Sequence, residues 1–141
     1  MIFSMKIDLT NREEVRKAAQ EARTKFGDVD ILINNAGLVQ GKLLLDSNEV
    51  LTSKQLTVNL ESHFWTIREF LPAMIQKKRG HIVSIASMAA YAGYPLMSDY
   101  NASKAGACNL NDALRVELKR EGHSYVKCTT ICPYFINTGM F

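Results

Sequence analysis

The stretch "VDILINNAG", residues 29–37, sets the expected fold. Its first six residues are a compact run rich in β-branched side chains, which is typical of a strand buried in a parallel sheet. The run breaks at "NNAG", a turn signal. "HIVSIA", residues 81–86, is a second apolar run of this kind, and "YVKCTTIC", residues 125–132, is a third that Pro133 ends. The chain therefore contains the pattern of several buried strands.

Helical patterns separate these strands. Thr10 and Glu13 have the spacing of a capping box at the start of the first helix. Pro72 should kink the second helix or end its regular part. The alternation indicates an α/β domain on a parallel sheet, whose ligands gather at the carboxyl ends of the strands. The expected order is strand 5–9, helix 11–26, strand 29–34, helix 52–78, strand 81–86, helix 99–120 and strand 125–132. The apolar stripe of the second helix comprises Leu56, Leu60, Phe64, Ile67, Leu71 and Met74.

Composition and charge exclude some classes of function. The 141 residues are 47% hydrophobic and 22% charged, as expected for one soluble globular domain. The net charge is +3, but basic residues are interleaved with acidic ones. The densest basic cluster, residues 77–79, is followed by Gly80 and is typical of a helix C-terminus. We therefore expect no nucleic-acid partner.

The three cysteines favour a reduced compartment, because they have neither a paired spacing nor a secretory signal. Cys128 and Cys132 flank an apolar run with no further ligands nearby, so core packing is favoured over metal binding. No segment has the 18 or more apolar residues of a membrane span, and "MIFSM" at the start is too short for a signal or an anchor. The chain's own residues indicate a cytoplasmic location.

The stretch "SDYNASKAG", residues 98–106, places Tyr100 and Lys104 four residues apart on one helix face. Such a pair also occurs by chance, as a half-buried ring beside a solvated amine. A tyrosine with its ordinary pKa of about 10 would need a shift of roughly three pH units, worth about 4 kcal/mol, to act as a base near neutrality. We expect the Lys104 cation to lower the pKa of Tyr100 by favouring its phenolate.

Several short sequence motifs follow one another along the chain. "DLT" at 8–10, "NNAG" at 34–37 and Asn59 precede Ser87, which lies 13 residues before Tyr100, and "CPYFINTGMF" ends the chain. In this order they resemble the short-chain dehydrogenase/reductase family across nearly all 141 residues. Within that family the sequence is similar to those of epidermal-type retinol dehydrogenases and of the hydroxysteroid dehydrogenase branch.

The resemblance implies roles for the site residues. Tyr100 would accept the hydroxyl proton of an alcohol as hydride leaves for the cofactor, NAD or NADP, and Lys104 would also bond the nicotinamide ribose. Ser87 would hold the substrate oxygen, and Asn59 would anchor a water in a proton relay. Alternatives stay open: Ser87 as a turn cap, Asn59 as a helix residue bonded to backbone, and Asp8 as a turn acid. The implied cofactor-binding residues are Asp8, Asn35, Ala36, Gly37, Tyr100, Lys104, Ile136 and Thr138.

The family's phosphate-binding fingerprint, Thr-Gly-x-x-x-Gly-x-Gly, does not occur in the sequence. We expect residues 1–141 to form a partial domain with family strands 3 to 6 only, an incomplete Rossmann-like doubly wound parallel sheet. It would lack the N-terminal glycine-rich βαβ unit and the C-terminal substrate-binding segment. Dinucleotide binding should then be weak, and residues 29–34 should form an exposed edge unless strand 5–9 pairs with them.

Two functions remain open from the sequence. The first is a nicotinamide-dependent oxidoreductase acting on a small lipid alcohol or ketone, a retinoid or a steroid. The second is a truncated, non-catalytic remnant or an interaction-only partner of a full-length relative. Helices 52–78 and 99–120 would then form a homo- or heterodimer that charges at Phe64 and Leu114 should disrupt. The family resemblance also implies the endoplasmic reticulum membrane or lipid droplets as a location.

Overall fold

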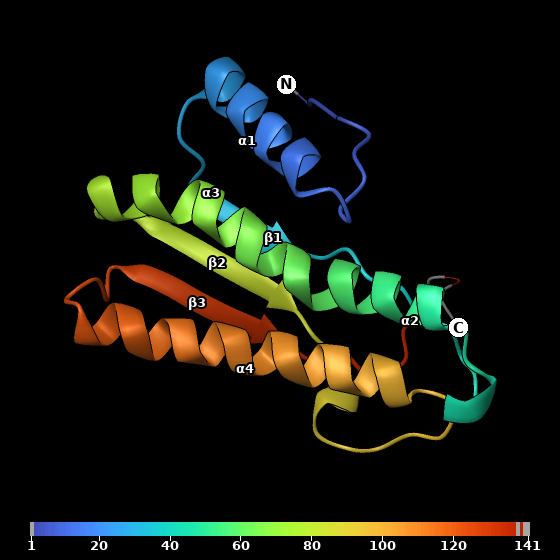
Figure 1. Cartoon of the computed structure of the whole chain (residues 1–141). Helices are drawn as coiled ribbons and strands as arrows, with labels where there is room; N and C mark the ends of the chain where they lie inside the picture. Colours follow the sequence, from blue (N-terminus) through green and yellow to red (C-terminus); the bar gives the residue numbers. More distant parts are fainter. Residues whose placement is uncertain (1, 138, 140–141) are drawn as a thin grey trace.

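Three parallel strands form the centre of the structure, a computed structural model that describes residues 2–137 and residue 139. They are β1 (Ile31–Asn34), β2 (Gly80–Ile85) and β3 (Val126–Ile131), and their order in the sheet is β1-β2-β3 (Figure 1). Ile33 of β1 lies opposite Val83 of β2, which lies opposite Thr129 of β3. The prediction of an α/β fold on a parallel sheet is confirmed.

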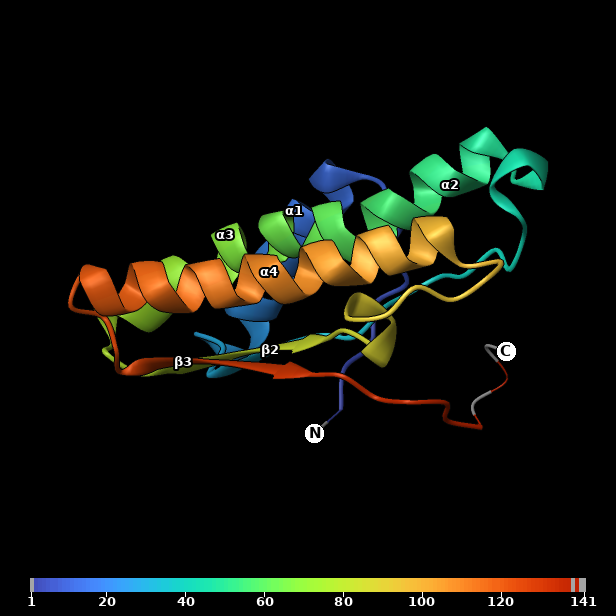
Figure 2. The same cartoon turned by 90° about the horizontal axis from the view of Figure 1, so that it is seen from below.

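In the sequence, α1 precedes β1 and the other helices lie between the strands. Figure 2 shows α3 and α4 on one face of the sheet. In the described part of the chain, no helix covers the opposite face. The elements are α1 (Arg12–Phe26), η1 (Leu44–Asp46), α2 (Glu49–Leu56), the π-helical η2 (Thr57–Glu61), α3 (Ser62–Gln76), η3 (Met88–Ala90) and α4 (Ser98–Arg120). None of the described helices is long and apolar enough to cross a bilayer.

The core lies between the sheet and the two long helices. Each of its large side chains stabilises the fold by roughly 1.5–3 kcal/mol on burial. The buried cluster comprises Leu32, Ile67, Met74, Ile82, Leu114, Leu118 and Val126. On the opposite face, Ile31 and Ile33 are 57% and 58% exposed, and β1 has no partner strand on its outer side among the described residues. The exposed edge expected at residues 29–34 is therefore confirmed.

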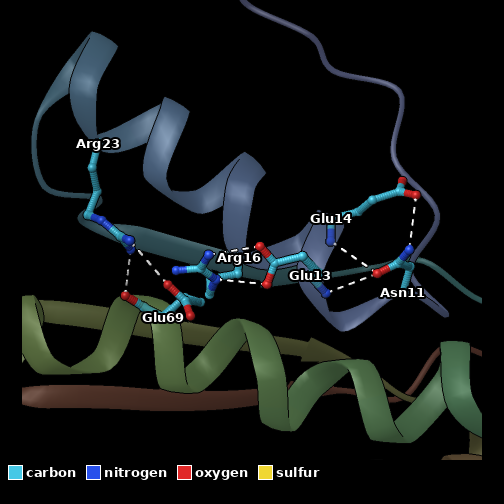
Figure 3. A network of polar contacts seen from close by, with 6 residues as sticks. All are labelled: Asn11, Glu13, Glu14, Arg16, Arg23 and Glu69. Atoms are coloured by element: carbon cyan, nitrogen blue, oxygen red, sulfur yellow. Dashed lines mark hydrogen bonds and ion pairs between the residues drawn. The ribbon is translucent and has the colours of Figure 1, made fainter.

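The strand expected at residues 5–9 does not form, and the suggested pairing of this segment with β1 is wrong. The segment is fixed to α1 instead of the sheet, because the backbone N–H of Asp8 donates to Glu14 Oε2 at 2.8 Å. The helix cap also lies one residue later than predicted. Asn11 Oδ1 accepts from the backbone N–H groups of Glu13 and Glu14 (Figure 3).

Helix α1 is tied to α3 by one partly buried ion pair. Arg23 donates to the backbone carbonyl of Glu69 at 2.9 Å and to its Oε2 at 3.1 Å (Figure 3). The contact joins two segments 46 residues apart. It fixes α1 against α3.

The long second helix departs from the predicted stripe. The π-helical turn η2 interrupts it, and Leu56 and Phe64 are 37% and 43% exposed. A π-helical turn contains more residues than an α-helical turn. The side chains after it therefore point in a different direction from the one that an unbroken helix of 3.6 residues per turn would give them. Val58 and Asn59 are buried in this turn. The helix also continues past Pro72, so its regular part does not end there.

Gly80, at the start of β2, has no room for a side chain. A Cβ placed there would lie 2.6 Å from Met74 Cβ and 2.5 Å from Met74 Cγ, and Met74 is fully buried. We expect Gly80→Ala to lower the free energy of unfolding by about 1–3 kcal/mol, because overpacking forces the core to shift. Chemical denaturation measures this change.

Gly93→Ala is the matched control, because a Cβ at Gly93 meets nothing within 4 Å. It should change the free energy of unfolding by less than about 0.5 kcal/mol. Equal stability of the two variants would contradict the packing described between β2 and α3.

Candidate active site

A hollow of about 600 Å³ opens at the carboxyl ends of the strands. Its walls come from the segments that follow β1, β2 and β3 and from the first two turns of α4. Parallel strands converge at this edge, which is why residues far apart in sequence meet there. The predicted site residues among its lining are Asn35, Gly37, Ser87, Tyr100, Lys104 and Ile136.

Ser87 and Tyr100 meet across this hollow. Ser87 follows β2, and its Oγ accepts from the backbone N–H of Ala89 at 3.1 Å. Tyr100 lies in the first turn of α4 and is buried. Burial raises the pKa of Tyr100, while a hydrogen bond with Ser87 lowers it. Ser87 therefore caps a turn and also contacts the phenol. A role as a turn cap and a role beside Tyr100 are thus compatible.

Lys104 is buried one helical turn after Tyr100. Its Nζ donates to the backbone carbonyl of Ile85 at 2.9 Å and lies 5.7 Å from the centroid of the Tyr100 ring. Burial lowers the pKa of Lys104 from 10.5 to about 8. The pKa of Tyr100 is raised in this structure and not lowered as expected, because burial outweighs the hydrogen bond with Ser87 and keeps the phenol protonated.

Asn59 is fully buried, and its side chain holds the loop that follows β1. Its Oδ1 accepts from the backbone N–H of Leu38 at 2.7 Å, and its Nδ2 donates to the Leu38 carbonyl at 2.9 Å and to Ser103 Oγ at 2.9 Å. A Cβ at Gly37 would lie 3.3 Å from Lys104 Nζ and 3.5 Å from Asn59 Oδ1. The geometry thus agrees with the interpretation of Asn59 as a helix residue bonded to backbone. It also explains why position 37 is a glycine, since a side chain there would crowd Lys104 and Asn59.

Not every predicted residue joins this group. The Asp8 carboxylate accepts from the backbone N–H and the hydroxyl of Thr10, and it does not line the hollow. This is the turn-acid alternative. Ala36 lines a second hollow of about 160 Å³, which it shares with Asn35. Thr138 lies outside the described residues.

The sequence analysis missed His63, which lines this second hollow and is 2% exposed. Burial, and to a smaller extent the positive charge of Lys104, lowers the pKa of His63 to about 4, so the ring is neutral at physiological pH. Its Nδ1 has no hydrogen-bond partner among the described residues. No spacing signal could have revealed it, because its burial depends on how the start of α3, two residues after the π-helical turn, packs in the fold.

Known proteins resemble this chain in sequence and in fold. The sequence matches the family described as "short chain dehydrogenase" over residues 1–141. The chain belongs to the short-chain dehydrogenase family. This confirms the resemblance that the motifs indicated.

Curated relatives of this short-chain dehydrogenase include retinol dehydrogenases. It is 42% identical over 140 residues to "Short-chain dehydrogenase/reductase family 16C member 6" of Bos taurus, covering 99% of this chain and 44% of that protein. It is 42% identical over 134 residues to "Epidermal retinol dehydrogenase 2" of Homo sapiens, covering 95% of this chain and 43% of that protein. The chain thus spans less than half the length of the curated relatives it matches.

Solved structures of this family superpose well on the chain. A metagenomic short-chain oxidoreductase in complex with NADP is 31% identical with a TM-score of 0.86, over 93% of this chain and 58% of that one. A short-chain dehydrogenase from Streptomyces avermitilis is 25% identical with a TM-score of 0.88, over 97% of this chain and 49% of that one. The incomplete Rossmann-like sheet is therefore the sheet of this family.

The buried Lys104 makes stability depend on pH. Because its pKa is about 8 when folded and 10.5 ordinarily, the unfolded chain binds more protons between these pH values. The Lys104 contribution to the free energy of unfolding should therefore rise with pH across this window, by roughly 3 kcal/mol in total. Lys104→Met removes the titration, so its stability relative to the wild type should fall across the window in urea denaturation.

Lys119→Met is the matched control, because Lys119 lies on the same helix and is exposed. Its stability relative to the wild type should not change across the window. Parallel pH profiles for Lys104→Met and the wild type would contradict the burial of the Lys104 ammonium.

Proposed function

We propose that this chain carries the proton-transfer part of a nicotinamide-dependent oxidoreductase site that interconverts an alcohol and a carbonyl. The observation that carries the proposal is the meeting of Ser87 and Tyr100 in one hollow, with the Lys104 ammonium one helical turn away. A hydroxyl, a phenol and a cation are the groups needed to hold a substrate oxygen and to move one proton.

A nicotinamide cofactor held by Lys104 and the backbone near Gly37 would supply the hydride chemistry. Ser87 Oγ hydrogen-bonds the substrate oxygen and holds it beside the phenol. Because burial raises the pKa of Tyr100, the phenol is protonated and suited to donate its proton to a carbonyl oxygen. Below pH 8 Lys104 is mostly charged and stabilises the phenolate that this transfer leaves.

In the oxidative direction Tyr100 must first lose its proton, so this direction should be favoured at higher pH. The water relay predicted for Asn59 remains a prediction. The side-chain bonds of Asn59 to Leu38 and Ser103 support a positioning role, in which it keeps Gly37 close to Lys104.

The hollow fits the nicotinamide end of such a cofactor. Gly37 leaves open the approach to Lys104 that a Cβ would narrow, and Asn35 and Ile136 complete the walls. NADP is bound by the metagenomic relative. We propose that NAD or NADP contacts Lys104 and the backbone near Gly37, and that binding by this chain is weak because its sequence has no glycine-rich fingerprint.

A lipid alcohol or ketone, a retinoid or a steroid, is the proposed substrate. A small opening of about 20 Å³ beside Ser87 and Tyr100 is lined mainly by apolar and aromatic side chains, so it offers an apolar surface next to these two residues but does not hold a whole substrate. Several of the curated relatives are named retinol dehydrogenases, among them "Retinol dehydrogenase 10-B" of Danio rerio and "Epidermal retinol dehydrogenase 2" of Homo sapiens. The apolar lining of this opening comprises Met88, Ala89, Met97, Pro133 and Phe135.

Removing the phenolic hydroxyl tests the proposal. With a retinoid or steroid ketone and a saturating reduced cofactor, Tyr100→Phe should lower kcat/KM by at least about a hundredfold, because the proton donor is gone. Ser87→Ala should lower it by at least about tenfold, because one hydrogen bond to the reacting oxygen is lost. Cofactor absorbance reports the rate.

Tyr91→Phe is the matched control for loss of a phenol outside the hollow, and it should retain wild-type activity. Wild-type turnover by Tyr100→Phe would refute the assignment. No turnover by the wild type with either cofactor, at concentrations that calorimetry shows to saturate the protein, would exclude an enzymatic function of this chain.

The second candidate function is association through α3 and α4 with a copy or a relative. Exposed apolar side chains on these helices, Phe64 and Val116, favour it. The predicted contact residue Leu114 does not, because it is 8% exposed and belongs to the core. A charge at Leu114 would therefore unfold the chain instead of testing association.

Charges at the exposed positions test this second candidate. If the chain dimerises through these helices, Phe64→Glu and Val116→Glu should each weaken the dimer by at least about tenfold, or 1.4 kcal/mol. Sedimentation equilibrium measures this. Leu45→Glu, at a 97% exposed position in η1, should leave association unchanged. A dimer insensitive to both helix variants would contradict the proposed surface.

A further inference from the structure

Two cysteines and a tyrosine from three separate segments meet beside the catalytic hollow. Cys108 lies on α4, Cys132 directly follows β3, and Tyr91 follows η3. The Tyr91 hydroxyl lies 3.0 Å from Cys108 Sγ, and Cys132 Sγ donates to the same hydroxyl at 3.9 Å. Both cysteines are free thiols of intermediate exposure, so a small reagent can reach them.

The two thiols also influence each other. Burial raises the pKa of Cys132, and a hydrogen bond with the Cys108 thiol raises it further. The hydrogen bond to Cys108 is likewise the largest cause of the raised pKa of Tyr91. These contacts place the two sulfur atoms around one hydroxyl and within reach of each other.

The third cysteine cannot take the place of either. Cys128 lies four residues before Cys132 on an extended segment, so their Cα atoms are roughly 13 Å apart, whereas a disulfide needs less than about 7 Å. Cys128 also faces Arg115, whose charge lowers its pKa, although burial raises that pKa more. Arg115 lies about 10 Å beyond Cys108 along α4. Only Cys108 and Cys132 are placed to react together.

We propose that Cys108 and Cys132 form a thiol–disulfide exchange site whose reagent is a small disulfide such as oxidised glutathione. One cysteine thiolate attacks a sulfur of the reagent and releases one glutathione thiolate, which leaves a mixed disulfide on the protein. The second cysteine attacks the protein sulfur of that bond and releases the second glutathione. The protein loses two electrons and two protons, and the reagent becomes two molecules of reduced glutathione.

The pair adjoins the backbone that carries Ser87. The backbone N–H of Ala86 donates to the Ile131 carbonyl at 2.8 Å, and that of Met88 donates to the Pro133 carbonyl at 3.0 Å. A hydrogen bond from the Ser87 backbone also lowers the pKa of Cys132. The disulfide would therefore lie directly against the segment of Ser87. The site itself stands on the cysteine geometry alone and is independent of the proposed oxidoreductase activity.

Mass spectrometry of the folded wild-type chain tests the site. After incubation with oxidised glutathione, free thiols are alkylated and the protein is digested with trypsin. Before alkylation, the intact mass of the protein should fall by two hydrogen atoms. After digestion, we expect a disulfide cross-link between peptides 105–115 and 128–141. Fragmentation of this cross-linked pair should assign the bond to Cys108 and Cys132. This pairing should exceed every other by at least tenfold in the folded chain, but not in denaturant.

Matched variants complete the experiment. Cys128→Ser should give the same cross-link as the wild type, whereas Cys108→Ser and Cys132→Ser should lose it and retain glutathione on the remaining cysteine. Glutathione adducts on the wild type without a cross-link, or a cross-link that survives in Cys132→Ser, would overturn the proposal. The wild-type result is decisive even if a variant does not fold.

Discussion

The site depends on one buried amide. Asn59 lies in the π-helical turn between α2 and α3, and its side chain binds both the N–H and the carbonyl of Leu38. These bonds give partners to the N–H and the carbonyl of a part-buried loop backbone. They also keep Gly37 against the ammonium of Lys104. Further along the same loop, Gln40 Nε2 donates to Asp99 Oδ2 of α4 at 3.1 Å, so the amide of Asn59 fixes the part of the loop nearest Gly37.

Burial, more than charge pairing, sets the electrostatics around this loop. It raises the pKa of Tyr100 and lowers those of Lys104 and His63, so each group is shifted toward its neutral form. Perturbed groups of this kind cluster at functional sites, but they cost stability. A phenol that keeps its proton, next to a lysine that titrates near pH 8, forms a site whose protonation changes within an accessible pH range.

The chain spans less than half the length of its curated relatives. The sheet face that no described helix covers, and the edge strand β1, carry exposed isoleucines. The core therefore comes from one layer of helices packed on one layer of strands. Within that layer the carboxyl ends of the strands bring Ser87, Tyr100 and Lys104 together, while the Asp8 carboxylate is held by the turn at Thr10. The three side chains proposed to move the proton thus lie at the carboxyl ends of the three described strands.

The sequence by itself determined the α/β alternation, the parallel strands and the bounds of α4, because apolar runs and helical periods are local patterns. It also determined the grouping of Ser87, Tyr100 and Lys104, through motif order. Only the tertiary structure decided that residues 5–9 form no strand, since a strand needs a neighbour. It likewise decided that Asn59 in the π-helical turn and His63 in α3 are buried, and that burial outweighs the Ser87 hydrogen bond at Tyr100. These outcomes depend on packing between distant segments, which no local pattern encodes.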